Sequence, residues 1–391
     1  MTNNVFLSYL NPLVAKDFPR SEGTIGSKIH YYNPQNESVD IRQFHVAIMG
    51  IPDGRSSRKN KPCALAPNVI RKYFYQLYNH VDSAQIIDMG NIKPGGTVED
   101  TYTAVKEVVA ELLRNRLFVL ILGGSNDMIL PNYYAYESFK RLVDISCIDS
   151  RFDIGRGKKD DPSMSYVSKI VLHEPSYIFN FTNIGYQSYY VDKDSIELID
   201  SLLFDSCRLG IARTDLTEVE PAIRKSDIVG IDISAVRAAY APGNAFASPN
   251  GFDGEEICAL TRYAGISSNV SSLGIYEYNP SLDIQFRTAK LIAQMLWYFI
   301  DGYYMRINEY PYDDAKKFIK YYVMSTLFEH GITFYKSKQT GRWWMEVECP
   351  DDLKERFAGQ FLTPCSYNDY LVACRDEVPD RWMRVYRKLM R

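Results

Sequence analysis

The chain has 391 residues, which is long for one domain and long enough for a large α/β domain with an appendage. Apolar residues make up 46% of it, and the formal net charge is −3, from 45 basic and 48 acidic residues spread along the chain. This balance argues against a nucleic-acid-binding face and against a polybasic patch that would bind a membrane.

The N-terminus lacks the basic and apolar regions of a signal peptide, so we expect none. The longest apolar run, Leu291–Ile300, lies beside Arg287, Lys290 and Gln294 and predicts a buried helix face instead of a membrane span. The cysteines are odd in number and form no Cys-x-x-Cys pair, which predicts reduced thiols in a cytoplasmic protein. They are Cys63, Cys147, Cys207, Cys258, Cys349, Cys365 and Cys374.

Short apolar runs rich in Ile and Val recur along the chain, and each ends in polar residues or glycine. Runs of this kind predict strands that are buried on both faces. In chain order they are Phe44–Pro52, Gln85–Gly90, Arg116–Gly124, Asp144–Ser150, Tyr177–Gln187, Cys207–Ala212, Asp227–Ser234 and Ser271–Asn279.

Helical spacing of apolar residues lies between several of these runs, at Thr103–Arg114, Ser195–Phe204 and Asp283–Tyr303. Alternation of strands and helices predicts a three-layer α/β/α sandwich around a mainly parallel sheet of about eight strands. We assign this domain to residues 1–307. A small α+β appendage is predicted over 308–391, with a hairpin from Ile332–Tyr335 to Trp343–Val347 and a helical tail.

In a doubly wound sheet, the ligand site lies beyond the carboxyl ends of the strands. Polar segments follow the predicted strands at Gly123–Asp127, Asp149–Asp153, Asp232–Gly243 and Glu277–Pro280. Their convergence predicts a site at this edge, independently of any family.

Three of these segments resemble the metal-binding motifs of the arginase (ureohydrolase) superfamily. They are Gly123-Gly124-Ser125-Asn126-Asp127, Asp149-Ser150-Arg151-Phe152-Asp153, and Asp232-Ile233-Ser234 followed by the loop Ala241–Gly251. Pro52–Arg58 with Ala66–Arg71 and Glu277–Ala289 resemble two flanking segments of that family. Phe179–Thr182 with Gly185–Gln187 is most similar to formimidoylglutamases.

The resemblance implies two manganese ions that are held by two histidines and four aspartates and that activate a hydroxide against an amidine carbon. Asp149, Asp153 and Asp232 match these ligands, whereas Asn126, Arg151 and Ser234 replace two histidines and one aspartate.

The ligand losses fall unevenly on the two implied metal positions. One position keeps Asp149, Asp153 and Asp232 together with the amide of Asn126, an oxygen set that suits Mn²⁺, Mg²⁺ or Ca²⁺. The other loses both of its private ligands to Arg151 and Ser234, and a guanidinium has no lone pair to give a metal. We therefore expect one divalent cation and no binuclear manganese centre.

Three aspartates at one point repel one another, so the pKa of at least one of their carboxyl groups would rise unless a cation neutralised them. We hypothesise that Arg151 supplies this counter-charge, because its planar fork suits carboxylates. Glu277 matches a family position that contacts the amidine group of the substrate. Its alternative role is a structural ion pair with Arg151 or Arg237. None of the five histidines falls in a motif, and only His173 lies near a position with a family role in proton transfer.

Two functions remain open. The first is a catalytically degenerate ureohydrolase whose pocket, with Arg151, Ser234 and Glu277, still binds a small amidine, an amino-acid-like ligand or a protein partner. The second is an active C–N hydrolase of a linear amidine such as formimidoylglutamate, agmatine or arginine, which uses a single metal or none. A third, weaker possibility is a purely structural subunit, because the resemblance implies a homo-oligomer.

Overall fold

A ten-stranded sheet forms the centre of the computed structural model, which describes residues 2–34, 39–155, 161–324 and 331–390. The strand order is β1-β4-β3-β5-β10-β9-β6-β7-β8, with β2 paired to β4. All pairings are parallel except that of β1 with β4. The strands are β1 Leu10–Asn11, β2 His30–Tyr31, β3 Val46–Gly50, β4 Ile86–Ile92, β5 Phe118–Leu122, β6 Val143–Ile148, β7 Ile178–Tyr186, β8 Asp205–Arg208, β9 Ile228–Asp232 and β10 Ser272–Tyr276.

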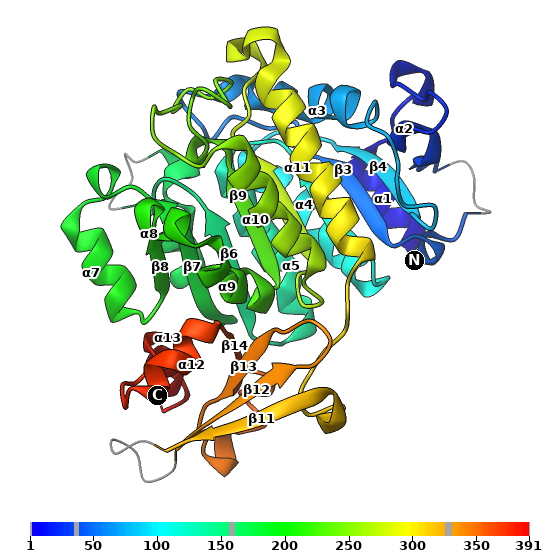
Figure 1. The fold of residues 1–391 in the computed structure, drawn as a ribbon. Coiled ribbons are helices and arrows are strands. Elements are labelled where there is room, and N and C mark those ends of the chain that lie inside the picture. The colour runs from blue at the N-terminus through cyan, green and yellow to red at the C-terminus, as the bar shows by residue number, and fades with distance from the viewer. Residues whose placement is uncertain (1, 35–38, 156–160, 325–330, 391) are drawn as a thin grey trace.

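The expected three-layer sandwich is confirmed, because alternate residues of each central strand enter two separate cores. In β3, Val46 and Ile48 belong to one core while Ala47 and Met49 belong to the other. Helices α3 (Ala66–Phe74), α10 (Gly254–Ile266) and α11 (Arg287–Tyr304) cover the first face, and Figure 1 shows α10 and α11 lying across the sheet. Helices α4 (Val98–Arg114) and α5 (Ile129–Tyr136) cover the second.

Shorter helices complete the main part of the chain. They are α1 Thr2–Tyr9, α2 Ile25–Lys28, α6 Tyr166–Val171, α7 Lys193–Ser201, α8 Leu209–Thr214 and α9 Glu220–Lys225. The eight predicted strands correspond to β3–β10, with one error in extent. The run Cys207–Ala212 was expected to be extended throughout, but the strand ends at Arg208 and α8 begins at Leu209.

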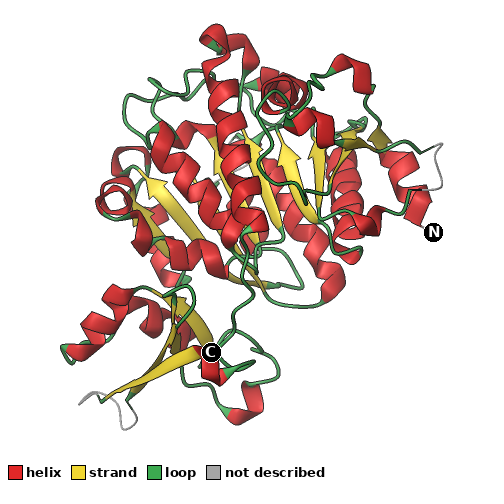
Figure 2. Ribbon diagram, turned by 45° about the vertical axis from the view of Figure 1, so that its right-hand side comes forward, coloured by secondary structure: helices red, strands yellow, loops and turns green. Residues whose placement is uncertain are grey.

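The C-terminal part forms a second sheet of four antiparallel strands in the order β11-β12-β13-β14. Its elements are β11 Phe318–Val323, β12 Ile332–Ser337, β13 Trp343–Glu346, β14 Leu362–Cys365, α12 Tyr367–Cys374 and α13 Asp380–Leu389. The predicted hairpin pairs β12 with β13, and the tail residues Trp382, Val385 and Leu389 are buried in the core beside it. In Figure 2 the central strands point away from this part, so it lies at the amino ends of those strands. The boundary at residue 307 stays a prediction.

Candidate metal centre

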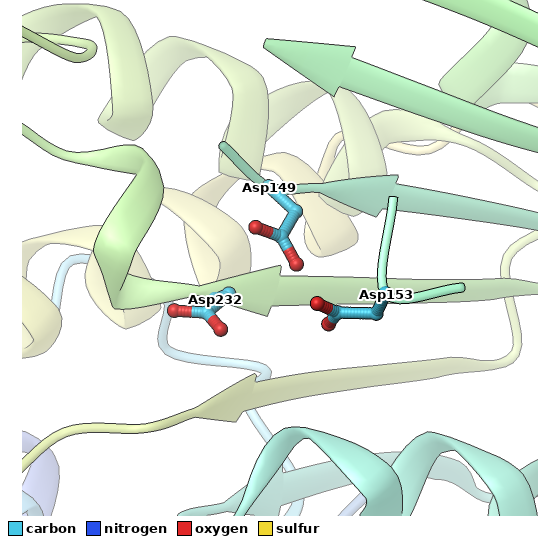
Figure 3. A group of neighbouring side chains, drawn as sticks. All are labelled: Asp149, Asp153 and Asp232. Carbon is cyan, nitrogen blue, oxygen red and sulfur yellow. The ribbon is translucent and has the colours of Figure 1, made fainter. Parts of the chain in front are cut away.

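Three aspartates meet where two neighbouring strands of the large sheet end. Asp149 directly follows β6, Asp232 is the last residue of β9, and these strands pair in parallel. Asp153 lies four positions after Asp149, with its backbone in the left-handed region at φ 50°. One oxygen from each carboxyl group lies within 4.8 Å of the other two, and all three residues are buried (Figure 3). The convergence that the sequence predicted is present.

The electrostatics of this cluster are those of acids packed together without a paired cation. Burial, followed by the charge of Asp153, raises the pKa of Asp149 well above its usual value. Burial and Asp232 raise the pKa of Asp153 to about 7, while burial and Asp149 raise that of Asp232 to about 8. No ion pair among the described residues involves any of the three. The site therefore disfavours three simultaneous negative charges unless a cation is present.

Asn126 reaches the cluster from the turn after β5. Gly123 and Gly124 both have positive φ, and a Cβ at Gly123 would lie 2.9 Å from the Cβ of Ala66, so glycine is required there. The Asn126 amide nitrogen donates to Asp149 at 3.1 Å and to Asp153 at 2.7 Å. Its Oδ1 is buried and has no hydrogen-bond partner among the described residues.

Arg151 lies beside the aspartates but does not bind them through its side chain. Its guanidinium carbon is 4.4 Å from the centre of the Tyr190 ring and 5.5 Å from that of Phe246. Only its backbone N–H reaches the cluster, donating to Asp149 at 2.9 Å. The hypothesis that its fork pairs with the carboxylates is therefore wrong in its geometry. Its positive charge opposes, from a distance, the larger effect of burial on the pKa of each aspartate.

Ser234 occupies the position of the lost family aspartate with a neutral hydroxyl. Its Oγ lies 3.1 Å from the Oγ of Ser150, and its backbone N–H donates to Asp232 at 2.6 Å. Neither contact supplies a negative charge for a second cation.

Glu277 is buried behind the cluster and is held by neutral donors, not by the ion pair with Arg151 or Arg237 that was its alternative role. It accepts hydrogen bonds from Ser57 Oγ at 2.9 Å, Asn60 Nδ2 at 2.8 Å and the backbone N–H of Asn126 at 3.0 Å. Burial and the charge of Asp232 raise its pKa to about 8. Its backbone has φ 61°, and such strained non-glycine positions concentrate at functional sites.

The predicted pocket residues are gathered around one small cavity of ≈ 10 Å³, room for about one small guest such as a water molecule. Asp149, Asp153, Asp232, Arg151, Ser234 and Glu277 all line it. Sequence reasoning missed Ser57, Asn60, Tyr190 and Phe246. All four lie in or beside segments that resemble the family, but no motif marks them individually.

The residues present fit one divalent cation. Three close carboxylates provide oxygen ligands, and the unpartnered Oδ1 of Asn126 is a fourth oxygen that a half-turn of its amide would bring to the cluster. They do not fit a second cation, because Arg151 and Ser234 offer a guanidinium and a hydroxyl where private ligands are needed. Among the described residues, this is the one group of three or more His, Cys, Asp or Glu side chains close enough to share a metal.

The chain belongs to the arginase family, because the sequence model of that family matches residues 44–301. Among curated proteins it is similar to the formimidoylglutamase of Lysinibacillus sphaericus, with 25% identity over 64% of this chain and 83% of that protein. It is 24% identical to the formimidoylglutamase of Halalkalibacterium halodurans, over 65% of this chain and 86% of the other. The predicted superfamily and its formimidoylglutamase-like character are confirmed.

Solved structures agree on the fold. Formimidoylglutamase from Bacillus subtilis superimposes with a TM-score of 0.66 at 17% identity, over 74% of this chain and 95% of that one. Formiminoglutamase from Trypanosoma cruzi with Mn2+2 gives 0.63 at 18% identity, over 69% and 97%.

Other expectations from the sequence have mixed outcomes. No helix in the described ranges is long and apolar enough to cross a membrane, and Leu291, Leu296 and Phe299 of α11 are buried in the core. All seven cysteines are free thiols. His173 pairs with Glu137 and packs against the ring of Tyr134. His330 lies outside the described residues.

Proposed function

We propose that this protein is an arginase-family protein that holds one divalent cation on its aspartate cluster and lacks two-metal amidine hydrolysis. The observation that carries the proposal is the contrast between the two metal positions. Three carboxylates converge within 4.8 Å at one position. The private ligands of the other are replaced by Arg151, whose guanidinium contacts two rings, and by the hydroxyl of Ser234.

In this proposal Asp149, Asp153 and Asp232 hold the cation, with the Asn126 amide oxygen as a fourth donor. A divalent cation supplies positive charge and Lewis acidity at such a site. Glu277 lines the same cavity and matches the family position that contacts the amidine group of the substrate. Mn²⁺ is the first candidate, because the similar Trypanosoma cruzi enzyme is described with manganese; Mg²⁺ and Ca²⁺ also suit oxygen ligands.

A second candidate function is an active hydrolase of C–N bonds in a linear amidine, such as formimidoylglutamate, agmatine or arginine, with a single metal. The retained Glu277 and the similarity to formimidoylglutamases favour it. Against it stands the loss of the second metal position. A single ion can still lower the pKa of a bound water, but the resemblance implies that the family's hydroxide is activated by a pair of ions, and the second ion's private ligands are replaced here by Arg151 and Ser234.

The test is the manganese content of the purified protein after loading with Mn²⁺ and removal of free metal. We expect one equivalent per chain, lost in Asp232→Asn, and no turnover of arginine, agmatine or formimidoylglutamate. Two equivalents per chain would refute the proposal. One equivalent with turnover would establish the second candidate instead. Asp82→Asn, a change at an exposed residue, is the matched control.

The remaining expectations, a cytoplasmic homo-oligomer that binds neither nucleic acid nor membranes, stand as part of this proposal.

A further inference from the structure

A second, larger cavity lies where the two sheets meet, and we call it the junction cavity. Its volume is ≈ 730 Å³, within the range of small-molecule sites, which often occur at domain interfaces. The main sheet contributes Asp144 at the start of β6 and Asp227 just before β9. The C-terminal part contributes Trp344 and Gln360. It therefore lies at the opposite ends of the strands that carry the aspartate cluster.

Basic side chains in its wall have too few carboxylate partners. Arg224 and Arg342 share one carboxylate, that of Glu220, at 2.9 and 3.6 Å. Lys225 forms no ion pair or hydrogen bond with the described residues. The charges of Asp144, Asp205 and Asp227 act on its ammonium only from beyond ion-pair distance, and that ammonium lies 4.8 Å from the centre of the Phe179 ring. Arg224 is only 5% exposed, and its Nη1 has no acceptor in the described part of the chain. A buried guanidinium nitrogen without an acceptor is costly.

Three of the four acidic side chains of the wall already accept hydrogen bonds, and the fourth, Glu355, is exposed. Asp227 accepts from Arg141 at 2.6 Å and from the backbone N–H of Asp144 at 2.9 Å. Glu309 accepts from the hydroxyls of Ser337 and Thr340. Asp144 accepts from Gln360 at 3.2 Å through one oxygen, while its other oxygen and the Gln360 Oε1 have no donor within the described residues.

These observations define what would complement the wall. The surplus of cationic donors calls for an oxyanion, and the two unpartnered acceptors call for a nearby hydrogen-bond donor. We propose that the junction cavity binds a small metabolite that carries a carboxylate or phosphate together with an amino or hydroxyl group. The C-terminal part thereby gains a role, because it supplies one wall of this site.

The test uses the full chain and isothermal titration with L-glutamate, glutarate, inorganic phosphate and agmatine. We expect one oxyanion site per chain, with glutamate favoured over glutarate because glutarate lacks the amino donor. If phosphate binds and neither carboxylate does, the anionic group of the metabolite is a phosphate. Agmatine, which carries no anion, is expected not to bind the cavity. The proposal would be overturned if no oxyanion bound at concentrations up to about 10 mM. That limit corresponds to a binding free energy weaker than roughly 3 kcal/mol.

Variants locate the site. Lys225→Met and Arg342→Met each remove one cation of the wall and should weaken binding by about tenfold, whereas Lys72→Met at an exposed lysine of α3 should not. If one of the two variants fails to fold, the other still tests the site. Unchanged binding in both would overturn the proposal. So would a loss in Arg151→Met with none in Lys225→Met, because the anion would then lie at the aspartate cluster.

Discussion

Asn126 and Arg151 replace metal ligands of the family in different ways. The Asn126 amide lies between two carboxylates and donates to both, so it partly offsets their repulsion without a cation. The Arg151 guanidinium is the obvious counter-charge but contacts the rings of Tyr190 and Phe246. The neutral amide of Asn126 thus contacts the carboxylates directly, and the charge of Arg151 acts on them from a longer distance.

Asp153 gives the cluster a measurable pH dependence. Its folded pKa of about 7 lies above its usual value of 3.8, so ionisation destabilises the metal-free fold as pH rises between these values, and the full cost persists above them. Asp153→Asn cannot ionise. We expect the variant's gain in melting temperature over the wild type, both metal-free, to be larger at about pH 8.5 than at about pH 5.

Added manganese and an exposed control variant check the prediction for Asp153→Asn. Mn²⁺ added at the higher pH should raise the melting temperature of the wild type and leave Asp153→Asn unchanged, because bound metal offsets the same charges. The exposed control Asp82→Asn should show no pH-dependent gain. An equal gain for Asp153→Asn at both pH values would contradict the charge crowding seen in the cluster.

The triple variant Asn126→His, Arg151→His, Ser234→Asp restores the ligand types that the family resemblance implies. Since the three surviving aspartates already converge, we expect manganese binding to rise from one to two equivalents per chain. Elemental analysis after dialysis measures it, and the single variant Asn126→His, which leaves Arg151 and Ser234 in place, should stay at one. A triple variant that also binds one equivalent would show that the surrounding backbone no longer permits two.

At the scale of elements, periodicity predicted the strands well because β3, β5, β6, β9 and β10 are buried on both faces and read as continuous apolar runs. The error at β8 has a physical reason. This edge strand is short and only partly buried, so Leu209 and Ile211 belong to a helix that its composition does not distinguish from an extended run.

The site was predictable only in part, for the same kind of reason. The motif positions place Asp149, Asp153 and Asp232 through the backbone of β6 and β9, which strand order fixes. The direction of the Arg151 side chain depends on Tyr190 and Phe246, which lie 39 and 95 residues later in the chain. No local pattern contains that information.

Helix α3 is attached to β4 by a fully buried ion pair. Arg71 donates to both oxygens of Asp88, at 2.7 and 3.0 Å, and neither side chain has exposed surface. Arg71→Met would leave Asp88 buried without its cation, so we expect a loss of about 3–5 kcal/mol in the free energy of unfolding by urea. The neighbouring exposed change Lys72→Met should lie within about 0.5 kcal/mol of wild type. Similar losses in both would indicate a general effect on the helix.

At the scale of the whole molecule, buried contacts join the two sheets. The Arg224 guanidinium lies 4.5 Å from the centre of the Trp344 ring and donates to the Trp343 carbonyl at 3.0 Å. A partly exposed contact adds to these, since Arg384 of α13 donates to the Phe204 carbonyl at 2.7 Å. The C-terminal part is therefore packed against the main domain, with Arg224 and Trp344 buried at the contact.

We predict that the wild type unfolds in a single calorimetric transition. Trp344→Ala removes a buried ring and the stacking partner of Arg224, at a cost of about 3–5 kcal/mol, and should resolve a separate, earlier transition for the C-terminal part. Trp297→Ala, at a partly buried residue of the main domain, should lower the melting temperature without splitting the transition. Two transitions in the wild type would contradict the prediction.

Strands β6 and β9 extend from the junction cavity to the aspartate cluster, about 17 Å at the usual rise per residue. Each strand therefore has a titratable group of one cavity at its start and a carboxylate of the other at its end. Two ligands that share rigid elements in this way are subject to thermodynamic linkage. Any factor by which an oxyanion alters the affinity for Mn²⁺ must equal the factor by which Mn²⁺ alters the affinity for the oxyanion. Occupancy of either site would then change the affinity of the other through the strands that the two sites share.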